Sequence, residues 1–389
     1  MTFSFVGSRL HANPPESTFQ KFDDRARAGE RLSVVFFGGS LTWGAQATDP
    51  QLTSYRALMA RRLTDYYPKA HFTFWDAAIG GTGSQLGAFR LERDVLSRHP
   101  DLVFLDFTVN DGPFSQPDPD RLGSYESLVR RLVQKGIPVV PVIFAVKKDT
   151  LPEAPDRPLD QKHKEIAAAY SLPIGDAVAL IRERVRSGAA QPDELWPLPD
   201  DTTHPGDAGY ALYAEAAWQA YEQAIRERLA PHVPDRMLHP DTYMSTRRQK
   251  ISQLGPLPAG WSLGQPQRTA ITFDFLPSRW LDEVSVATFS DKGPAPLRFT
   301  VQGRNVLLFG ESTPRSGQYE VRIDDQPPKT YDAGKFSQQG NLRYVETIAS
   351  GLEDGKTHTI EILPRLTLGQ ELRLESICVS GAPAEIATP

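Results

Sequence analysis

The 389-residue sequence contains a single cysteine, Cys378. An internal disulfide therefore cannot form, and a zinc site built from several cysteines is excluded. The longest apolar run, 139–146, is interrupted by Pro141 and is far shorter than the ~20 residues of a membrane-spanning helix. The N-terminal residues lack the basic and apolar segments of a signal peptide. We therefore expect no membrane span. We also expect a cytoplasmic location for the sequence as given, or a secreted or periplasmic one if a signal has been removed.

The sequence also lacks a strong excess of charge of either sign. It has 43 Lys and Arg residues against 48 Asp and Glu residues, which gives a net charge of −5. This balance argues against a protein that coats nucleic acid or an anionic membrane. With 40% hydrophobic and 23% charged residues, the chain can bury a core, so dominant disorder is excluded. At about 150 residues per domain, the length predicts two or three domains.

Residues 32 to about 230 alternate short strand-like runs with longer helical ones. This alternation predicts βαβ units and a parallel sheet. Five strands favour an α/β fold of the flavodoxin-like type, with three αβα layers and a five-stranded parallel sheet. Pro141 lies in the fourth expected strand and indicates an edge position or a bend. The expected strands are 32–37, 71–77, 101–107, 137–145 and 172–175, and the expected helices are 54–67, 84–98, 120–135, 160–169, 176–187 and 206–229.

The composition and periodicity of the sequence change near Pro231. A proline-rich segment without clear periodicity is followed, from Ala270, by short strand-like runs separated by turn-forming clusters. This pattern predicts a small all-β sandwich or jelly roll. We expect Cys378, in the last of these runs, to be a small apolar core residue. The predicted domains are an α/β domain at 1–230, a Pro-rich linker at 231–265 and a β-sandwich at 266–389.

Three expected strands are followed directly by residues suited to acyl-transfer chemistry. Ligand sites in open α/β sheets lie at the carboxyl ends of the strands. Ser40 follows the first strand and two glycines, although a helix-capping serine would look the same. Gly80 and Gly81 follow the second strand, and a backbone N–H of this glycine turn can stabilise an oxyanion. Asn110 follows the third strand and can donate its amide to an oxyanion, or can simply be a turn residue.

His204 differs from the other seven histidines, for which surface or packing roles are expected. Asp201 lies three residues before it on a tight loop, and such a carboxylate can orient an imidazole and stabilise its protonated form. The alternative for this loop is helix capping. The glycine-rich stretch 81–87 departs from the dinucleotide-binding fingerprint and follows the second strand rather than the first. We therefore expect no dinucleotide cofactor.

In chain order these residues are Ser, Gly, Asn, Asp and His, and the sequence resembles the SGNH hydrolases, also called the GDSL esterase/lipase family. The resemblance covers about residues 30–225. Gly39 stands where the family has Asp in its first block, and Thr108 stands where it has Gly in its third. The matching blocks are Gly38-Gly39-Ser40, residues 77–84 with Gly81, residues 108–111 with Asn110, and residues 201–205 with Asp201 and His204.

The resemblance implies a mechanism. Ser40 would be the nucleophile, His204 the general base and then acid, and Asp201 the residue that orients His204. The Ser40 N–H, the Gly81 N–H and the Asn110 side chain would form the oxyanion hole. The reaction would be ester hydrolysis through an acyl-enzyme, with neither cofactor nor metal.

The expected substrate is a small ester or an acylated carbohydrate, because β-domains are common among carbohydrate-directed members of this family. We favour a short-chain, acetyl-type carbohydrate esterase. The alternatives are a lipolytic or aryl esterase, similar to lysophospholipases or thioesterases, and a non-catalytic carbohydrate-binding scaffold. The sequence leaves the oligomeric state open. Five aromatic residues of the β-domain either stack on sugars or belong to the sandwich core: Trp261, Trp280, Tyr319, Tyr331 and Phe336.

Overall fold

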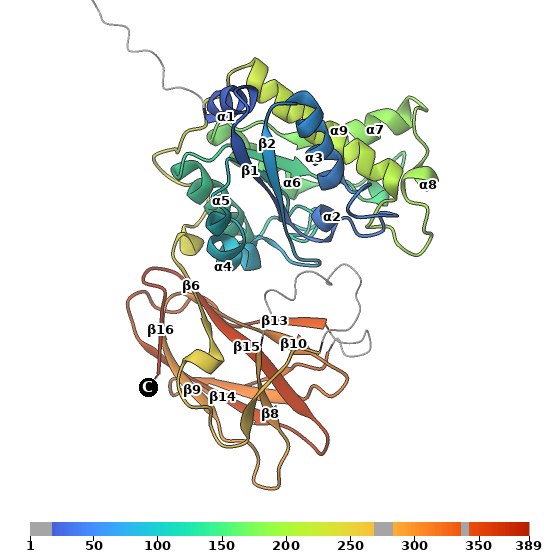
Figure 1. Cartoon of the computed structure of the whole chain (residues 1–389). Coiled ribbons are helices and arrows are strands. Elements are labelled where there is room, and N and C mark those ends of the chain that lie inside the picture. Colours follow the sequence, from blue (N-terminus) through green and yellow to red (C-terminus); the bar gives the residue numbers. More distant parts are fainter. Residues whose placement is uncertain (1–17, 268–282, 336–341, 389) are drawn as a thin grey trace, which may run out of the picture.

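The computed structural model describes residues 18–267, 283–335 and 342–388. It contains an α/β region, which runs from the first helix to the end of the last long helix (18–226), and a β region built from residues 246–387. Figure 1 shows the two regions stacked, with strands β6, β10 and β13 of the β region nearest the α/β region. Among the described residues, no helix is both long and apolar enough to cross a membrane.

The α/β region is built on a five-stranded parallel sheet with the order β2-β1-β3-β4-β5. This order confirms the predicted doubly wound, flavodoxin-like fold. The strands β1 and β3 are nearly continuous apolar runs in the centre of the core, as expected of strands covered on both faces, whereas β2 lies at the edge of the sheet and is only partly buried. The strands are β1 (Arg31–Gly38), β2 (His71–Ala78), β3 (Leu102–Leu105), β4 (Val139–Ile143) and β5 (Gly175–Asp176).

The expectation that Pro141 marks an edge strand was wrong. The strand β4 lies between β3 and β5, and Pro141 is paired with Leu105 of β3. A proline is tolerated here because β5 is only two residues long and pairs with Val142 and Ile143, beyond Pro141.

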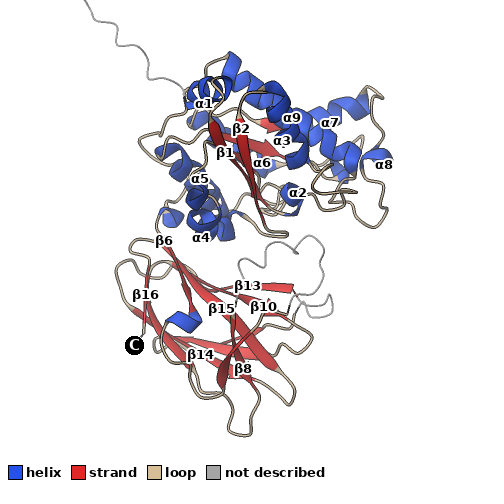
Figure 2. Ribbon diagram, in the orientation of Figure 1, coloured by secondary structure: helices blue, strands red, loops and turns tan. Residues whose placement is uncertain are grey.

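Helices cover both faces of the sheet (Figure 2). The helices α3 and α9 pack together on one face, and α4 and α5 pack together on the other. Ser54 caps α3 with its hydroxyl, which accepts the backbone N–H of Ala57. The sequence analysis missed α1, whose buried Phe19, Phe22 and Ala26 follow a helical spacing. The helices are α1 (Thr18–Arg27), α2 (Ser40–Trp43), α3 (Tyr55–Tyr66), α4 (Ser84–Asp94), α5 (Pro119–Gln134), α6 (Pro158–Ala169), α7 (Ala177–Arg186), α8 (Pro192–Leu195) and α9 (Asp207–Arg226), with short 3₁₀ turns η1 (Leu96–Arg98), η2 (Lys147–Thr150), η3 (Thr242–Met244) and η4 (Ile251–Gln253).

The β region consists of two antiparallel sheets that enclose a second apolar core, which confirms the predicted sandwich. One sheet has the order β13-β10-β15-β8-β7, with β6 also paired to β15, and the other has the order β12-β11-β14-β9-β16. The strands are β6 (Thr246–Lys250), β7 (Trp261–Gly264), β8 (Val284–Thr288), β9 (Leu297–Gln302), β10 (Asn305–Ser312), β11 (Gln318–Ile323), β12 (Lys329–Asp332), β13 (Leu342–Ala349), β14 (His358–Arg365), β15 (Glu371–Ser380) and β16 (Glu385–Ala387). The run expected at 270–275 lies outside the described residues. The predicted domain limits stay a prediction, and β6 and β7 lie inside the segment interpreted as a linker.

The aromatic residues of the β region mostly fill its core. Trp261, Tyr319 and Tyr331 are buried in the sandwich, so the sugar-stacking interpretation of these three was wrong. Trp280 and Phe336 lie outside the described residues.

The sheet that contains β10 and β15 is apolar on both faces. Leu308 and Ile377 face the sandwich core, whereas Leu307, Phe309 and Cys378 belong to the same apolar cluster as the core of the α/β region. Cys378 is fully buried, which confirms its predicted role as a core residue. The β region is therefore docked on the α/β region through apolar contacts.

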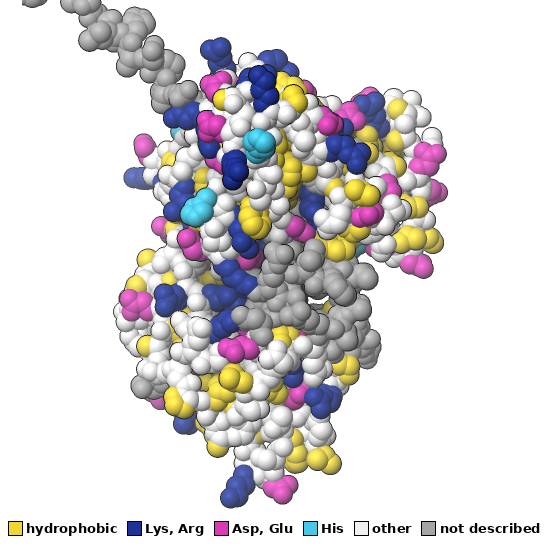
Figure 3. Space-filling view, viewed as in Figure 1, with side chains coloured by type: hydrophobic (Ala, Val, Ile, Leu, Met, Phe, Trp, Pro, Cys, Tyr) yellow, Lys and Arg dark blue, Asp and Glu magenta, His cyan; other side chains and the backbone are white. Residues whose placement is uncertain are grey.

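Polar contacts join the two regions as well. The Asn305 side-chain amide donates to Asp120 Oδ1 at 3.0 Å, and Arg131 donates to Thr246 Oγ1 at 3.3 Å. On the face drawn in Figure 3, acidic and basic side chains are interspersed over the α/β region, and Lys and Arg side chains gather near its junction with the β region.

Candidate active site

The residues predicted for catalysis lie where the parallel strands end. Ser40 is the first residue of α2 and is separated from β1 by Gly39 alone, Gly81 follows β2, and Asn110 follows β3. The carboxyl ends of parallel strands meet at one edge of the sheet, so the three turns come together. In Figure 1, β1 and β2 descend toward α2 on the side of the α/β region that faces the β region.

Ser40, His204 and Asp201 form one hydrogen-bonded relay. Ser40 Oγ lies 2.8 Å from His204 Nε2, and His204 Nδ1 lies 2.8 Å from Asp201 Oδ2. The carboxylate can only accept from Nδ1–H, so the network assigns the proton to Nδ1 and leaves Nε2 to accept from the serine hydroxyl. Ser40 is 5% exposed, so its hydroxyl is largely shielded from solvent.

Asp201 is held as a carboxylate by several donors. Its Oδ1 accepts the backbone N–H groups of Thr203 at 3.0 Å and His204 at 2.9 Å, which closes the loop around the histidine. Burial raises the pKa of Asp201, but the hydrogen bonds from His204 and Thr203 outweigh it and hold the pKa below its ordinary value. Gln46, a residue with φ +69°, adds a hydrogen bond from Nε2 to Asp201 Oδ2 at 3.2 Å.

The turn that carries Ser40 is too tightly packed for side chains. A Cβ at Gly38 would overlap with the Thr42 side chain and the backbone oxygen of Asp106, and a Cβ at Gly39 would overlap with Asn110 Oδ1. The space that an Asp at position 39 would need is thus occupied by the Asn110 amide.

The same contact places the Asn110 side chain beside the turn that carries Ser40. Asn110 is half-buried and packs against Gly39, directly before Ser40, while the backbone oxygen of Thr82 lies on the same side. Ser40 opens α2, and the first N–H groups of a helix have no partner within it. Gly81 has φ +63°, a backbone conformation that favours glycine. The arrangement can accommodate an anionic oxygen near Ser40.

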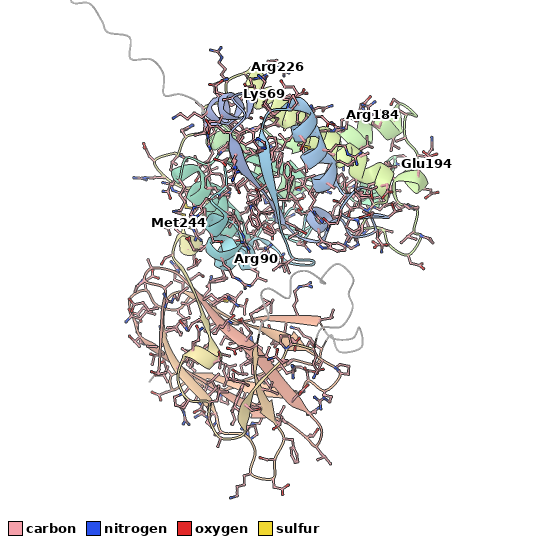
Figure 4. All side chains as sticks on the ribbon, viewed as in Figure 1. Lys69, Arg90, Arg184, Glu194, Arg226 and Met244 are labelled. Atoms are coloured by element: carbon pink, nitrogen blue, oxygen red, sulfur yellow. The ribbon has the colours of Figure 1, made fainter. Side chains whose placement is uncertain are left out.

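A buried arginine ties together the ends of the two strands that lead into these turns. Arg90 of α4 donates from Nη2 to the backbone oxygen of Gly38 at 2.7 Å and from Nη1 to that of Ala77. It is fully buried and lies over the Phe37 ring, 4.5 Å from its centroid, with Asp94 as its ion-pair partner at 3.2 Å. Figure 4 labels Arg90 at the end of the α/β region next to the β region.

Two buried carboxyl groups support the turn that carries Asn110. Asp111 Oδ1 accepts the Ser84 N–H at 2.9 Å, and Asp106 Oδ1 accepts both the N–H and the hydroxyl of Thr108. Burial raises the pKa of Asp106 to about 7 and that of Asp111 to about 6, although these hydrogen bonds act in the opposite direction. Thr108 Oγ1 also accepts the Phe144 N–H at 3.3 Å, so Thr108 connects the ends of β3 and β4.

Sequence reasoning missed Gln46, Arg90 and Asp106. Asp106 could have been found from its place at the end of an apolar strand, two residues before a threonine. Gln46 and Arg90 carry no local signal, because their partners are distant in sequence. Across the parts of the chain that the structure describes, no group of three or more His, Cys, Asp or Glu side chains is arranged to hold a metal ion.

Residues 36–212 match the sequence profile of the GDSL-like lipase/acylhydrolase family. This part of the chain is a GDSL-like lipase/acylhydrolase domain. The match covers most of the α/β region, including Ser40, Asn110, Asp201 and His204. None of the curated proteins compared with the chain matches it.

Solved structures resemble the chain well beyond the GDSL-like domain. One is a two-domain esterase (CEX) active on acetylated mannans, co-crystallized with mannopentaose; it is 26% identical, has a TM-score of 0.77, and is matched over 94% of both chains. A second structure, also of a two-domain esterase (CEX) active on acetylated mannans, is 25% identical to this chain and has a TM-score of 0.76. The match covers 95% of this chain and 96% of that one. The GDSL-like domain and these similarities identify the chain as a carboxylic ester hydrolase.

Proposed function

We propose that this chain is a serine esterase that removes short acyl groups, acetyl in particular, from acylated carbohydrates. The observation that carries the chemistry is the relay Ser40–His204–Asp201, with 2.8 Å at both of its contacts. The substrate class is supported by the similarity over nearly the whole chain to two-domain esterases active on acetylated mannans.

In the proposed mechanism, Ser40 Oγ attacks the ester carbonyl while His204 Nε2 takes the hydroxyl proton. Asp201 accepts from Nδ1–H and stabilises the resulting imidazolium. The carbonyl oxygen becomes an oxyanion that accepts hydrogen bonds from the Ser40 N–H, the Gly81 N–H and the Asn110 amide, each worth about 3–4 kcal/mol.

The tetrahedral intermediate then collapses. The bond to the alkoxy oxygen breaks, and His204 returns its proton to the leaving sugar hydroxyl. A water molecule, deprotonated by His204, attacks the acyl-enzyme by the same route, which releases the carboxylic acid and restores Ser40.

The substrate assignment can be tested by comparing acetylated manno-oligosaccharides with p-nitrophenyl esters from acetate to octanoate. We expect the acetylated oligosaccharides to have the highest kcat/KM and p-nitrophenyl turnover to fall with chain length. A maximum at octanoate would favour the lipolytic alternative instead. Ser40→Ala serves as the control for background hydrolysis.

A further inference from the structure

One strand of the β region lies at the edge of the active site. In β13, Val345 is paired with Phe309 of β10, and Arg343 is paired with Glu311. Phe309 and Val345 pack in the apolar cluster of the α/β region, whereas Tyr344 packs in the sandwich core. Side chains alternate along a strand, so Arg343 lies on the face that Val345 turns toward the α/β region.

Arg343 contacts the turn that is predicted to supply an oxyanion donor. If Gly81 carried a Cβ, that atom would overlap with the Arg343 guanidinium, and the three nearest atoms to it all belong to this group. The guanidinium therefore packs against the Cα of Gly81. The φ of +63° favours glycine at this position, and the absence of a Cβ leaves room for the arginine.

We infer that Arg343, a residue of the β region, is a positioning residue of the active site that holds the Gly81 turn in place. This inference rests on the proposed function. A glycine with positive φ is conformationally permissive, so its N–H keeps a fixed direction only if its surroundings restrain the turn. A guanidinium is planar and weakly hydrated, which suits it to pack against a backbone. An oxyanion donor is effective only when it is oriented before the charge develops.

Activity on p-nitrophenyl acetate depends on Arg343, even though this ester is too small to need a polysaccharide-binding surface. The effect falls on kcat rather than KM, because a misaligned oxyanion donor weakens the transition state more than the bound substrate.

The test uses the full chain with Arg343→Gln, and Arg343→Met as a second variant that keeps an apolar stem. Arg322→Gln is the matched control, because Arg322 is exposed on β11 of the other sheet. For each protein, kcat and KM on p-nitrophenyl acetate are measured, together with amide hydrogen exchange of residues 79–83. Arg343→Gln should lower kcat by about 10-fold or more with KM within about 2-fold, since complete loss of a donor costs about 10²–10³. Exchange of residues 79–83 should be about 10-fold faster.

Unchanged kcat, or unchanged exchange of residues 79–83, in both Arg343 variants would overturn the inference. So would an effect confined to KM on acetylated oligosaccharides, which would make Arg343 a substrate contact. A failure of the proposed function is recognised separately, by turnover that persists in Ser40→Ala. The exchange measurement still decides in that case whether Arg343 holds the Gly81 turn.

Discussion

Two adjacent carboxylates, Asp200 and Asp201, provide a sharp test of the relay. In Asp201→Asn the amide oxygen can keep accepting the backbone N–H groups of Thr203 and His204, which leaves the amide nitrogen facing His204 Nδ1. An NH₂ group cannot accept from Nδ1–H. The imidazole must then adopt the tautomer with its proton on Nε2, which cannot take the proton of Ser40.

The expected loss is large because the wrong tautomer removes the general base. The equivalent change in the Ser-His-Asp template lowers kcat by about 10⁴, or about 5 kcal/mol in the barrier. We expect a fall of about 10³–10⁴ in kcat on p-nitrophenyl acetate for Asp201→Asn. Asp200 is exposed, so Asp200→Asn should stay within about 2-fold of the wild type. Equal thermal unfolding temperatures would show that both variants are folded. A larger loss in Asp200→Asn, or less than a 10-fold loss in Asp201→Asn, would refute the assignment.

Other measurements test the surroundings of the relay. Asn110→Ala should lower kcat by about 10²–10³ with little change in KM, because an oxyanion donor acts on charge that develops in the transition state; a loss confined to KM would mean that Asn110 binds substrate. Because the folded chain raises the pKa of Asp106 above its unfolded value, the stability contributed by its proton is present below about pH 4 and lost as the pH rises toward about 7. Asp106→Asn keeps an acceptor for Thr108 and removes the cost of burying a charged carboxylate at high pH. At pH 8 the variant should therefore unfold at a higher temperature than the wild type, with a free energy of unfolding greater by up to about 4 kcal/mol, whereas at pH 4 it should not. A difference that stays constant with pH would contradict the raised pKa of Asp106. Truncation after Leu229 removes the β region and exposes the apolar surface that now contacts Phe309, so the shortened chain should aggregate; a soluble and fully active product would show that docking is dispensable.

The parts of the fold that the sequence predicted are those with strong local signals. The strand at Leu32–Phe37 is a nearly continuous apolar run, and the turn after it carries two glycines and a serine. Asp201 and His204 are only three residues apart, so their partnership is local as well. The periodicity of the sandwich strands likewise depends on neighbouring residues only.

The parts that were missed depend on contacts between distant segments. Pro141 indicated an edge, and only the brevity of β5 makes an interior proline tolerable. Arg90 reaches carbonyl groups 13 and 52 residues away, so its role follows from the assembled sheet rather than from its own helix. The approach of Arg343 to Gly81 requires the docking of the β region, which no sequence pattern specifies.

The central claim is that Ser40 is the nucleophile of an acyl-transfer relay. The most direct measurement is to label the full chain with a serine-directed organophosphonate, follow p-nitrophenyl acetate turnover, and map the adduct by peptide mass spectrometry. We expect one adduct per chain, on Ser40, formed in parallel with loss of turnover and strongly slowed in His204→Ala. An adduct on another residue that accounts for the inactivation, or full turnover by a chain labelled on Ser40, would contradict the assignment of Ser40 as the nucleophile.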